Sequence, residues 1–332
     1  MRNKVLEKKI EDSKKILMLA AEISKEYYHE PLIITYSGGK DSDVLLELAK
    51  ESLDKKQFEL LNSHTTIDAP ETVYYIRDTF KELEKSGIKT TIHYPHYEDG
   101  RFKSIWSLIE EKQIPPTRIQ RYCCYELKET SVPNRIIALG VREAESINRR
   151  GREVFATRAD KKGNANYFNY YHALEVFETD KKERKKEGLL ANEESVWDCT
   201  LVTKAKQNQD ILVNPIYKWT DSEIWEFIHE RNMKYNPLYD KGFKRVGCIG
   251  CPMSTRQKYE LEMYPKYKQN FINAFERMLK RRKEQGKDVD VGHWKDAEST
   301  YKWWIQDDTI EGQMTIYDFI GDPDDNNNDD NL

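Results

Sequence analysis

Residues 32–42 read LIITYSGGKDS, a short apolar run that leads into two glycines and a lysine. The apolar run is typical of a buried strand, and apolar residues at helical spacing resume at Val44. A tight turn between a strand and a helix lets two glycines bring backbone N–H groups against an anion, and the positive end of the helix dipole adds to the attraction. This stretch therefore predicts a loop that holds the phosphates of a nucleotide.

The side chains of this loop suit the same ligand. Lys40 can neutralise phosphate charge, Ser37 and Ser42 can donate hydroxyl hydrogen bonds, and Asp41 can either cap the helix or hold Mg²⁺. The glycine spacing differs from a Walker A loop, and an ordinary Gly-Gly turn is the structural alternative. A loop that grips the β,γ-phosphates of ATP leaves the α-phosphate open to attack, so we expect an adenylated intermediate and free pyrophosphate.

Strands and helices alternate along the first half of the chain. Helices are predicted over residues 11–28 and 70–83, and strands over residues 32–35, 58–61, 90–93 and 135–139. This alternation predicts an α/β fold with a doubly wound, mostly parallel sheet, in which ligands bind beyond the carboxyl ends of the strands.

The second half of the chain is less regular. Residues 151–209 form a polar stretch with scattered aromatics, which we interpret as an insertion without assigned function. Thr220 and Glu223 have the spacing of a capping box ahead of a helix that runs through Ile228. One long amphipathic helix is predicted over residues 257–282, and the last twelve residues, rich in Asn and Asp, are predicted to be disordered.

The composition is that of a soluble folded protein. The 332 residues carry a net charge of -4, and the 11% of aromatic residues argues against general disorder. No run approaches the roughly 18 apolar residues of a membrane helix, and the N-terminus leads into a charged helix rather than a signal peptide. We therefore expect a cytoplasmic protein that does not associate with a membrane. Basic runs at residues 181–186 and 280–283 indicate nucleic acid only weakly, because such runs are usually solvated faces.

Four of the five cysteines form two pairs. Cys123 and Cys124 are adjacent, while Cys248 and Cys251 form a C-x-x-C turn that can present two thiolates to one metal centre. Reduced cytoplasmic thiols argue against disulfides. The side chains of adjacent cysteines point in different directions, so they are poor ligands for a single tetrahedral zinc ion. In a cubane iron–sulfur cluster each cysteine can bind a separate iron. The pattern favours a [4Fe–4S] cluster over zinc, with four free buried cysteines as the structural alternative.

From about residue 33 to residue 252 the chain resembles the PP-loop ATP-pyrophosphatase superfamily. Within it, the chain is similar to the adenylylsulfate/phosphoadenylylsulfate (PAPS) reductase family, which includes the DndC-type DNA phosphorothioation proteins. The matching pieces are residues 37–42, 65–72, 121–124 with Lys128, 140–146, 215–221 and 235–239.

The resemblance implies an adenine nucleotide α-hydrolase-like fold, a cluster on the four paired cysteines, and the use of ATP and Mg²⁺. It implies that the segment from Gly140 to Arg142 closes over the nucleotide, which makes Arg142 a phosphate ligand; taken alone, Arg142 is as readily a surface arginine. The nucleotide-binding residues are then expected to be Ser37, Gly38, Gly39, Lys40, Asp41, Ser42, Asp68, Gly140 and Arg142, with Lys40, Asp41 and Arg142 acting in catalysis.

One departure from the family redirects the functional prediction. Sulfonucleotide reductases carry a nucleophilic cysteine beyond the cluster pair, and here no cysteine follows Cys251. We therefore expect ATP-dependent adenylation for iron–sulfur-assisted sulfur transfer to nucleic acid, with a sulfur-donor protein of the cysteine desulfurase type. The alternatives are a reductase whose thiol comes from Cys199 or a partner, and a non-catalytic nucleotide-sensing subunit of a modification or defence complex.

Residues 313–320, QMTIYDFI, resemble peptides that bind sliding clamps. In such peptides the glutamine enters a small polar pocket and a pair of apolar residues fills a hydrophobic pocket. The alternative is that these apolar residues anchor the tail to the protein's own core. The sequence thus predicts four parts: an N-terminal helix at 1–30, a nucleotide-binding and iron–sulfur domain at 31–256 with an insertion at about 151–209, a helical extension at 257–310, and a flexible tail at 311–332.

Overall fold

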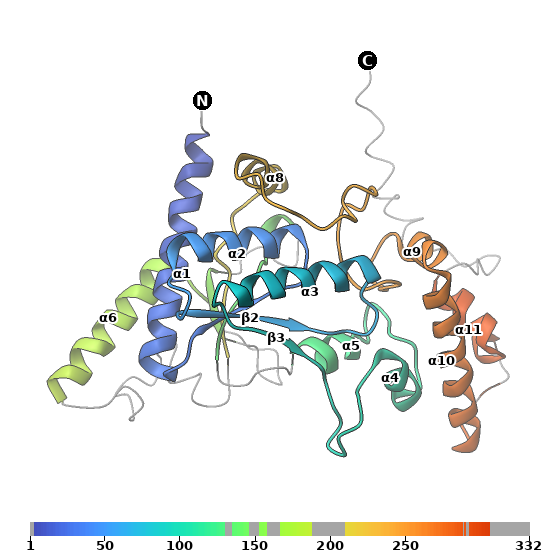
Figure 1. Ribbon diagram of the computed structural model, residues 1–332. Coiled ribbons are helices and arrows are strands. Elements are labelled where there is room, and N and C mark those ends of the chain that lie inside the picture. The colour runs from blue at the N-terminus through green and yellow to red at the C-terminus, as the bar shows by residue number, and fades with distance from the viewer. Residues whose placement is uncertain are drawn as a thin grey trace, which may run out of the picture. The chain divides into compact units, whose positions relative to one another are not determined.

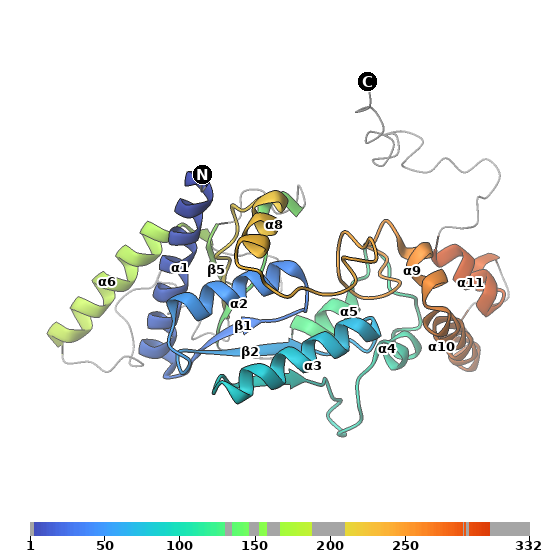
Figure 2. The ribbon, with the colours of Figure 1, turned by 45° about the horizontal axis from the view of Figure 1, so that its top comes forward.

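The computed structural model describes residues 3–129, 135–145, 153–157, 167–187, 210–287, 289 and 292–305. The chain divides into two compact units (Figures 1 and 2). The first unit comprises Met1–Ile105 and Tyr122–Cys248, and the second comprises Trp106–Arg121 and Ile249–Leu332. The second unit therefore combines an internal segment with the C-terminal part of the chain.

The first unit is built on a sheet with seven strands among the described residues. In spatial order they are β3 (Thr90–His93), β2 (Phe58–Ser63), β1 (Leu32–Thr35), β4 (Ile136–Ala138), β7 (Ile211–Val213), β5 (Phe155–Thr157) and β6 (Tyr167–Phe168). The first five strands in this order are parallel to one another, while β5 runs antiparallel to both β7 and β6. The predicted doubly wound, mostly parallel sheet is confirmed.

Helices flank this sheet where apolar residues recur at helical spacing. The long ones are α1 (Lys4–Tyr28), α2 (Lys40–Ser52), α3 (Pro70–Lys85), α6 (Tyr170–Glu187) and α8 (Asp221–Glu230), and the short ones are α5 (Tyr122–Cys124), η1 (Tyr125–Glu129) and η2 (Glu143–Glu145). Helix α1 begins earlier than predicted because the Asn3 side chain accepts a hydrogen bond from the N–H of Val5. The predicted capping box of Thr220 and Glu223 is present at the start of α8.

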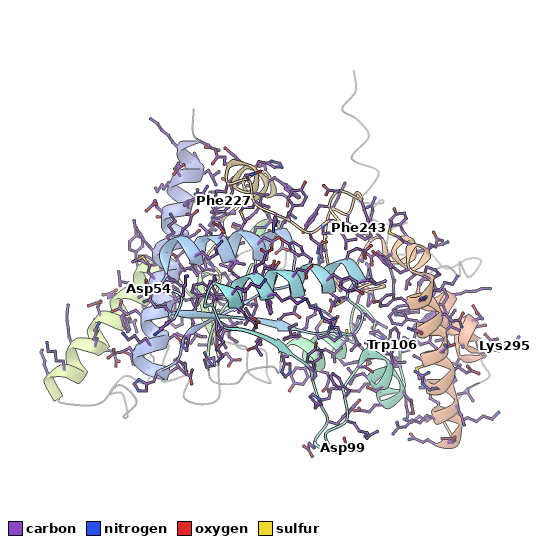
Figure 3. The ribbon with its side chains drawn as sticks, viewed as in Figure 1. Asp54, Asp99, Trp106, Phe227, Phe243 and Lys295 are labelled. Atoms are coloured by element: carbon purple, nitrogen blue, oxygen red, sulfur yellow. The ribbon has the colours of Figure 1, made fainter. Side chains whose placement is uncertain are left out.

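The core of the first unit fixes the start of α2. Leu17 of α1, Ile34 of β1 and Leu45 of α2 are fully buried in one cluster. The cluster also includes Phe227 of α8, which Figure 3 labels. Burying such a side chain is worth about 1.5–3 kcal/mol. The phosphate loop therefore runs between two elements that packing holds in place.

The second unit is a small helical core. It contains most of α4 (Ile105–Lys112), then α9 (Gln257–Met263), α10 (Pro265–Glu284), η4 (Gly292–Trp294) and α11 (Ala297–Trp304). Phe271 packs against Trp106 and Trp304, at ring-centroid distances of 4.9 and 4.4 Å.

The long amphipathic helix predicted within residues 257–282 is confirmed as α10, but it does not span the whole range. The structure has two helices, because Pro265 lacks the N–H that would continue α9 and disfavours a helical conformation at Tyr264, whose φ and ψ are -119° and 70°.

The predicted insertion at about 151–209 contains ordered elements that were not predicted, namely β5, β6 and α6. Cys199, the clamp-like peptide at 313–320 and the last twelve residues lie outside the described residues. Within the described part of the chain, no helix combines the length and apolar character that crossing a membrane requires.

Candidate functional site

The phosphate loop lies at the switch point of the sheet. It follows β1, whose neighbours are β2 on one side and β4 on the other. Ligands of doubly wound sheets bind beyond the strand ends where the order reverses in this way. The segment after β4 reaches the loop there: a Cβ atom at Gly140 would lie 3.3 Å from the carbonyl carbon of Asp41.

The backbone of the loop is held by contacts from distant segments. Gly38 has a φ of 72°, and a Cβ atom at this position would lie 2.8 Å from Cγ1 of Ile76. The buried Asn236 side chain donates a hydrogen bond of 2.9 Å to the Gly38 carbonyl. Glycine is thus required at position 38 for both its conformation and its lack of a side chain.

One role predicted for Asp41, at the start of α2, is not found in the structure. Gly39 is the N-cap of α2 without a side-chain cap, so the alternative in which Asp41 caps this helix is wrong. Ser42 donates its hydroxyl to the Gly39 carbonyl at 2.7 Å, and Ser37 donates to the Ser42 hydroxyl at 3.4 Å. The Ser42 hydroxyl therefore stabilises the start of the helix.

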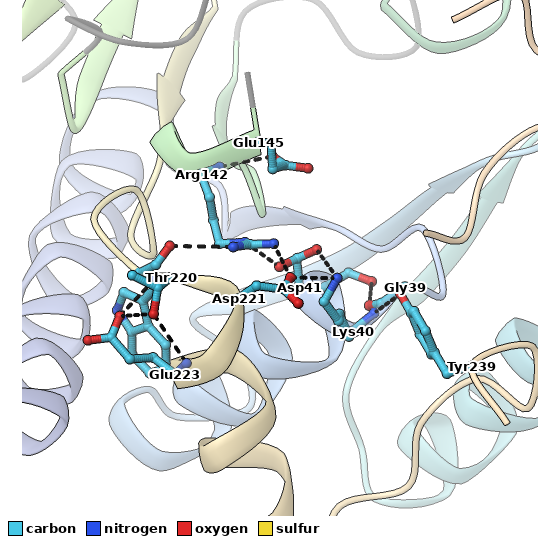
Figure 4. Close-up of polar contacts among 11 residues, drawn as sticks. Gly39, Lys40, Asp41, Arg142, Glu145, Thr220, Asp221, Glu223 and Tyr239 are labelled. Carbon is cyan, nitrogen blue, oxygen red and sulfur yellow. Dashed lines mark hydrogen bonds and ion pairs between the residues drawn. The ribbon is translucent and has the colours of Figure 1, made fainter. Parts of the chain in front are cut away.

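Four charged side chains meet beside the loop (Figure 4). Arg142 donates from Nε to Oδ1 of Asp41 at 2.5 Å and from Nη2 to Oδ1 of Asp221 at 3.0 Å. Lys40 Nζ lies 3.0 Å from the same oxygen of Asp221. The structure thus brings together the three predicted catalytic residues, and Arg142 is buried rather than a surface arginine.

Asp221 and Tyr239 belong to the site although neither was a predicted site residue. Burial tends to raise the pKa of Asp221, but its hydrogen bond to Lys40 and the charges of Lys40 and Arg142 outweigh burial and lower that pKa. Tyr239 accepts a hydrogen bond of 2.9 Å from the backbone N–H of Lys40. Both residues lie in segments that carry the family resemblance, at 215–221 and 235–239, and this resemblance is the signal in the sequence that points to them.

Asp68 lies beside one of the paired cysteines. It forms an isolated antiparallel bridge with Cys248, and it accepts a hydrogen bond of 3.1 Å from the N–H of Thr65. The Cys248 thiol donates to the Thr65 hydroxyl at 3.6 Å. The charge of Cys248 raises the pKa of Lys128, burial lowers it, and the charges of Asp68 and Cys124 add to the rise. A cation thus faces two of the predicted cluster ligands.

All four paired cysteines are free thiols of intermediate burial. Cys123, Cys124 and Cys248 belong to the first unit and Cys251 to the second. Among the described residues, no group of three or more His, Cys, Asp or Glu side chains is arranged to hold a metal ion. The Lys128 ammonium beside Cys124 and Cys248 suits thiolates and the negative charge of a thiolate-bound cluster, so the donor chemistry fits the predicted group.

The sequence matches the phosphoadenosine phosphosulfate reductase domain over residues 31–254, which is more than half of the chain. The protein therefore belongs to this family. The matched range includes the phosphate loop, the Gly140 to Arg142 segment and all four paired cysteines.

Individual relatives are distant or match short stretches. An uncharacterized protein of Methanocaldococcus jannaschii is 22% identical over 263 residues, covering 77% of this chain and 51% of the relative. The adenosine 5'-phosphosulfate reductase of Anoxybacillus flavithermus is 41% identical over 46 residues, covering 14% of this chain and 20% of the relative. The chain thus spans about half or less of the length of these curated relatives.

Solved structures show weak likeness. A PAPS reductase from Candida auris, in a phosphate complex, has a TM-score of 0.41 at 14% identity, with 75% of this chain and 96% of that chain covered. The U34-tRNA thiolase NcsA from Methanococcus maripaludis, with its [4Fe–4S] cluster, has a TM-score of 0.36 at 16% identity, with 83% of this chain and 80% of that chain covered.

Proposed function

We propose that the protein binds ATP on residues 37–42 and transfers the adenylyl group to an acceptor. The observation that carries this proposal is the convergence of two buried cations, Lys40 and Arg142, on one point beside the start of α2. Cations at a helix N-terminus after a parallel strand form a site for phosphate groups. Nucleotide-dependent sulfur chemistry is also the chemistry of the family.

In the proposed reaction an acceptor oxygen forms a bond to the α-phosphorus of ATP. The bond from the α-phosphorus to the bridging oxygen breaks, and pyrophosphate leaves with that electron pair. Lys40 and Arg142 neutralise charge on the leaving phosphates, and Asp41 is the proposed ligand of Mg²⁺. Sulfur at the sulfide oxidation level then forms a bond to the acceptor atom that carries the adenylated oxygen. The bond from that atom to the oxygen breaks, and AMP leaves with the electron pair.

Sulfur transfer is proposed to use a [4Fe–4S] cluster held by Cys123, Cys124, Cys248 and Cys251. When bound, such a cluster supplies iron that can bind sulfur. In the second unit, Arg118 donates a hydrogen bond of 3.0 Å to the Pro252 carbonyl, next to Cys251, and Arg118 shortly precedes Cys123 in the chain. A cysteine desulfurase type of protein is the proposed sulfur donor, and a thiol reductant is proposed to supply the two electrons that release its persulfide sulfur at the sulfide level.

Nucleic acid is the proposed acceptor, in a reaction like DNA phosphorothioation. One face of α10 supports it: polar residues recur there every three to four positions, opposite the buried Phe271, Ile272, Phe275 and Met278. The face consists of Lys266, Asn270, Asn273, Arg277, Lys280 and Arg281. Helix α10 carries seven Lys or Arg residues against two Glu, and such side chains bind phosphate backbones.

The test is pyrophosphate release by anaerobically purified protein, with ATP and Mg²⁺, in the presence and absence of DNA or tRNA. We expect release that depends on nucleic acid and is lost in Lys40→Ala. Arg142→Gln should also lose it, whereas Lys55→Ala, on an exposed turn, should retain it. The absence of pyrophosphate release with every nucleic acid would favour a nucleotide-sensing subunit over an enzyme.

A second candidate is reduction of a sulfonucleotide. The local identity of 41% to an adenosine 5'-phosphosulfate reductase favours it, although that match covers 46 residues. Turnover of adenylylsulfate with thioredoxin, without a need for ATP, would establish this activity in place of adenylation.

A further inference from the structure

One carboxylate oxygen of Asp221 lies where the two buried cations of the site converge. Its Oδ1 atom is 3.0 Å from Nζ of Lys40 and 3.0 Å from Nη2 of Arg142 (Figure 4). An anionic oxygen shared by a lysine and an arginine is also the arrangement in which proteins hold a phosphate oxygen. Asp221 thus provides an anionic oxygen at the place where a phosphate oxygen of the proposed nucleotide would bind.

The two sides of this contact differ in exposure. The side chains of Lys40 and Arg142 are 6% and 4% exposed, while the side chain of Asp221 is 61% exposed. The cations are therefore fixed by packing, and the carboxylate reaches them from the solvent side.

The backbone that carries Asp221 is firmly held. Trp219 is buried, and its Nε1 donates a hydrogen bond of 3.0 Å to the Ser13 hydroxyl. The capping box of Thr220 and Glu223 fixes the start of α8. Rotation of the Asp221 side chain can therefore release the two cations without movement of the helix.

Charge balance indicates which carboxylate would leave. Lys40 and Arg142 are balanced by Asp41 and Asp221, so an added phosphate gives the cluster a net negative charge. Asp41 is 20% exposed and pairs with Nε of Arg142 at 2.5 Å, whereas Asp221 is the more exposed partner. The less costly exchange is the departure of Asp221.

We propose that Asp221 is an exchangeable internal anion, which occupies a phosphate-oxygen position in the nucleotide-free protein and rotates away when phosphate binds. This inference rests on the proposed nucleotide site and adds a function for a residue outside the predicted site. When no phosphate is bound, Asp221 keeps the buried cations paired. It also disfavours ligands with a single phosphate, because only a di- or triphosphate makes enough contacts to displace it.

A different role for Asp221 predicts the opposite result. If Asp221 were a ligand of Mg²⁺, its removal would weaken Mg²⁺-dependent binding and leave metal-free binding unchanged or weaker. If it is an internal competitor, its removal strengthens binding without metal. Binding in EDTA and in Mg²⁺ therefore separates the two roles.

The experiment measures binding of inorganic phosphate, inorganic pyrophosphate and ATP by calorimetry for the wild type, Asp221→Asn and Asp221→Ala. In EDTA we expect both variants to bind pyrophosphate about two- to five-fold more tightly than the wild type, the range for an exposed charge that competes for cations. Inorganic phosphate should gain by a larger factor than ATP. Thermal unfolding of each variant shows that it is folded.

Glu226→Gln is the matched control. Glu226 lies on the same helix, and its carboxylate accepts a hydrogen bond from Asn3 instead of contacting the cations. An equal gain in affinity for pyrophosphate in Glu226→Gln would show that the effect comes from net charge alone. That result would overturn the proposed exchange of Asp221 for phosphate. If the wild type binds and neither Asp221 variant binds more tightly, the proposed exchange is also overturned. If neither the wild type nor any variant binds, the proposed nucleotide site itself is overturned.

Discussion

Gly140 lies directly against the backbone of Asp41. A Cβ atom at position 140 would stand 3.3 Å from both the carbonyl carbon and the carbonyl oxygen of Asp41. This contact joins the segment after β4 to the first turn of α2, and it lets Arg142 reach Asp41 from a different strand. The geometry of the charged cluster therefore depends on a residue without a side chain.

Gly140→Val should weaken ATP binding, because the new side chain pushes the Arg142 segment away from the phosphate loop. We expect a loss of about tenfold or more in affinity, equivalent to at least about 1.4 kcal/mol. Calorimetric titration with ATP measures it. Gly247→Val is the matched control, since a Cβ atom there meets no heavy atom within 4 Å. Equal losses in both variants would contradict the role of close approach.

The two loop glycines should respond differently to alanine. Gly38→Ala forces a residue with a side chain into a φ of 72° and against Ile76, and we expect a loss of roughly 1–3 kcal/mol in the free energy of unfolding. At Gly39 a Cβ atom would lie 3.4 Å from the Tyr239 hydroxyl, which is ordinary contact. Gly39→Ala should therefore stay close to the wild type in stability. Urea unfolding of both variants measures the difference, and a larger loss at Gly39 would refute this assignment.

A buried carboxyl behind the loop predicts a pH dependence of stability. Burial raises the pKa of Asp43 to about 7, against the lowering effect of the hydroxyls of Tyr36 and Tyr75. Between about pH 4 and pH 7 the native state keeps a proton that the unfolded state has released. The contribution of Asp43 to the free energy of unfolding therefore falls as pH rises through this window, and it is constant above it.

Asp43→Asn should remove this fall, since the amide does not ionise. The stability of the variant relative to the wild type should rise from pH 5 to pH 8 by an amount on the order of 2 kcal/mol. Denaturant unfolding of both proteins at the two pH values provides the comparison. A difference between the proteins that does not change with pH would show that Asp43 is ionised throughout.

The α/β part of the fold was predictable because its signals are local. The strand at residues 90–93 was predicted with the bounds that β3 has, since a short run of β-branched residues suffices to identify it. The break at Pro265 also had a local signal, but amphipathic spacing on both sides of the proline favoured a single helix.

The composition of the site was only partly predictable. Lys40 and Asp41 lie in the glycine loop, and Arg142 followed from the family resemblance. Asp221 had a sufficient local explanation as the first residue of a capped helix, while its contact with Arg142 joins residues 79 positions apart. No periodicity or motif in the sequence reports such a pairing, because packing of the sheet and α8 creates it.

The cysteine pairs predict an iron content that depends on Cys248. Anaerobically prepared protein should contain about four irons and matching sulfide, and Cys248→Ser should lose most of both. Cys199→Ser is the control, because Cys199 lies outside both pairs. Elemental analysis and the visible absorption spectrum provide the measurement. Stoichiometric zinc without sulfide would instead establish a zinc site.

The polar face of α10 predicts a salt-dependent interaction with nucleic acid. Lys266 and Lys280 are exposed on this face, and at 1.5 Å per residue they are about 21 Å apart, far enough to contact separate phosphates. Replacing both with Gln should weaken DNA binding and reduce the slope of log affinity against log salt by about 1.8, or roughly 0.9 for each lost contact. Fluorescence anisotropy with a duplex at several salt concentrations measures this slope.

The control variant is Lys182→Gln with Lys185→Gln, two exposed lysines of the other basic run, on α6. Both double variants lose two positive charges, so only specific contacts through α10 predict different slopes. Equal slopes in the two variants would identify the α10 residues as an ordinary solvated face, and the acceptor would then have to bind elsewhere.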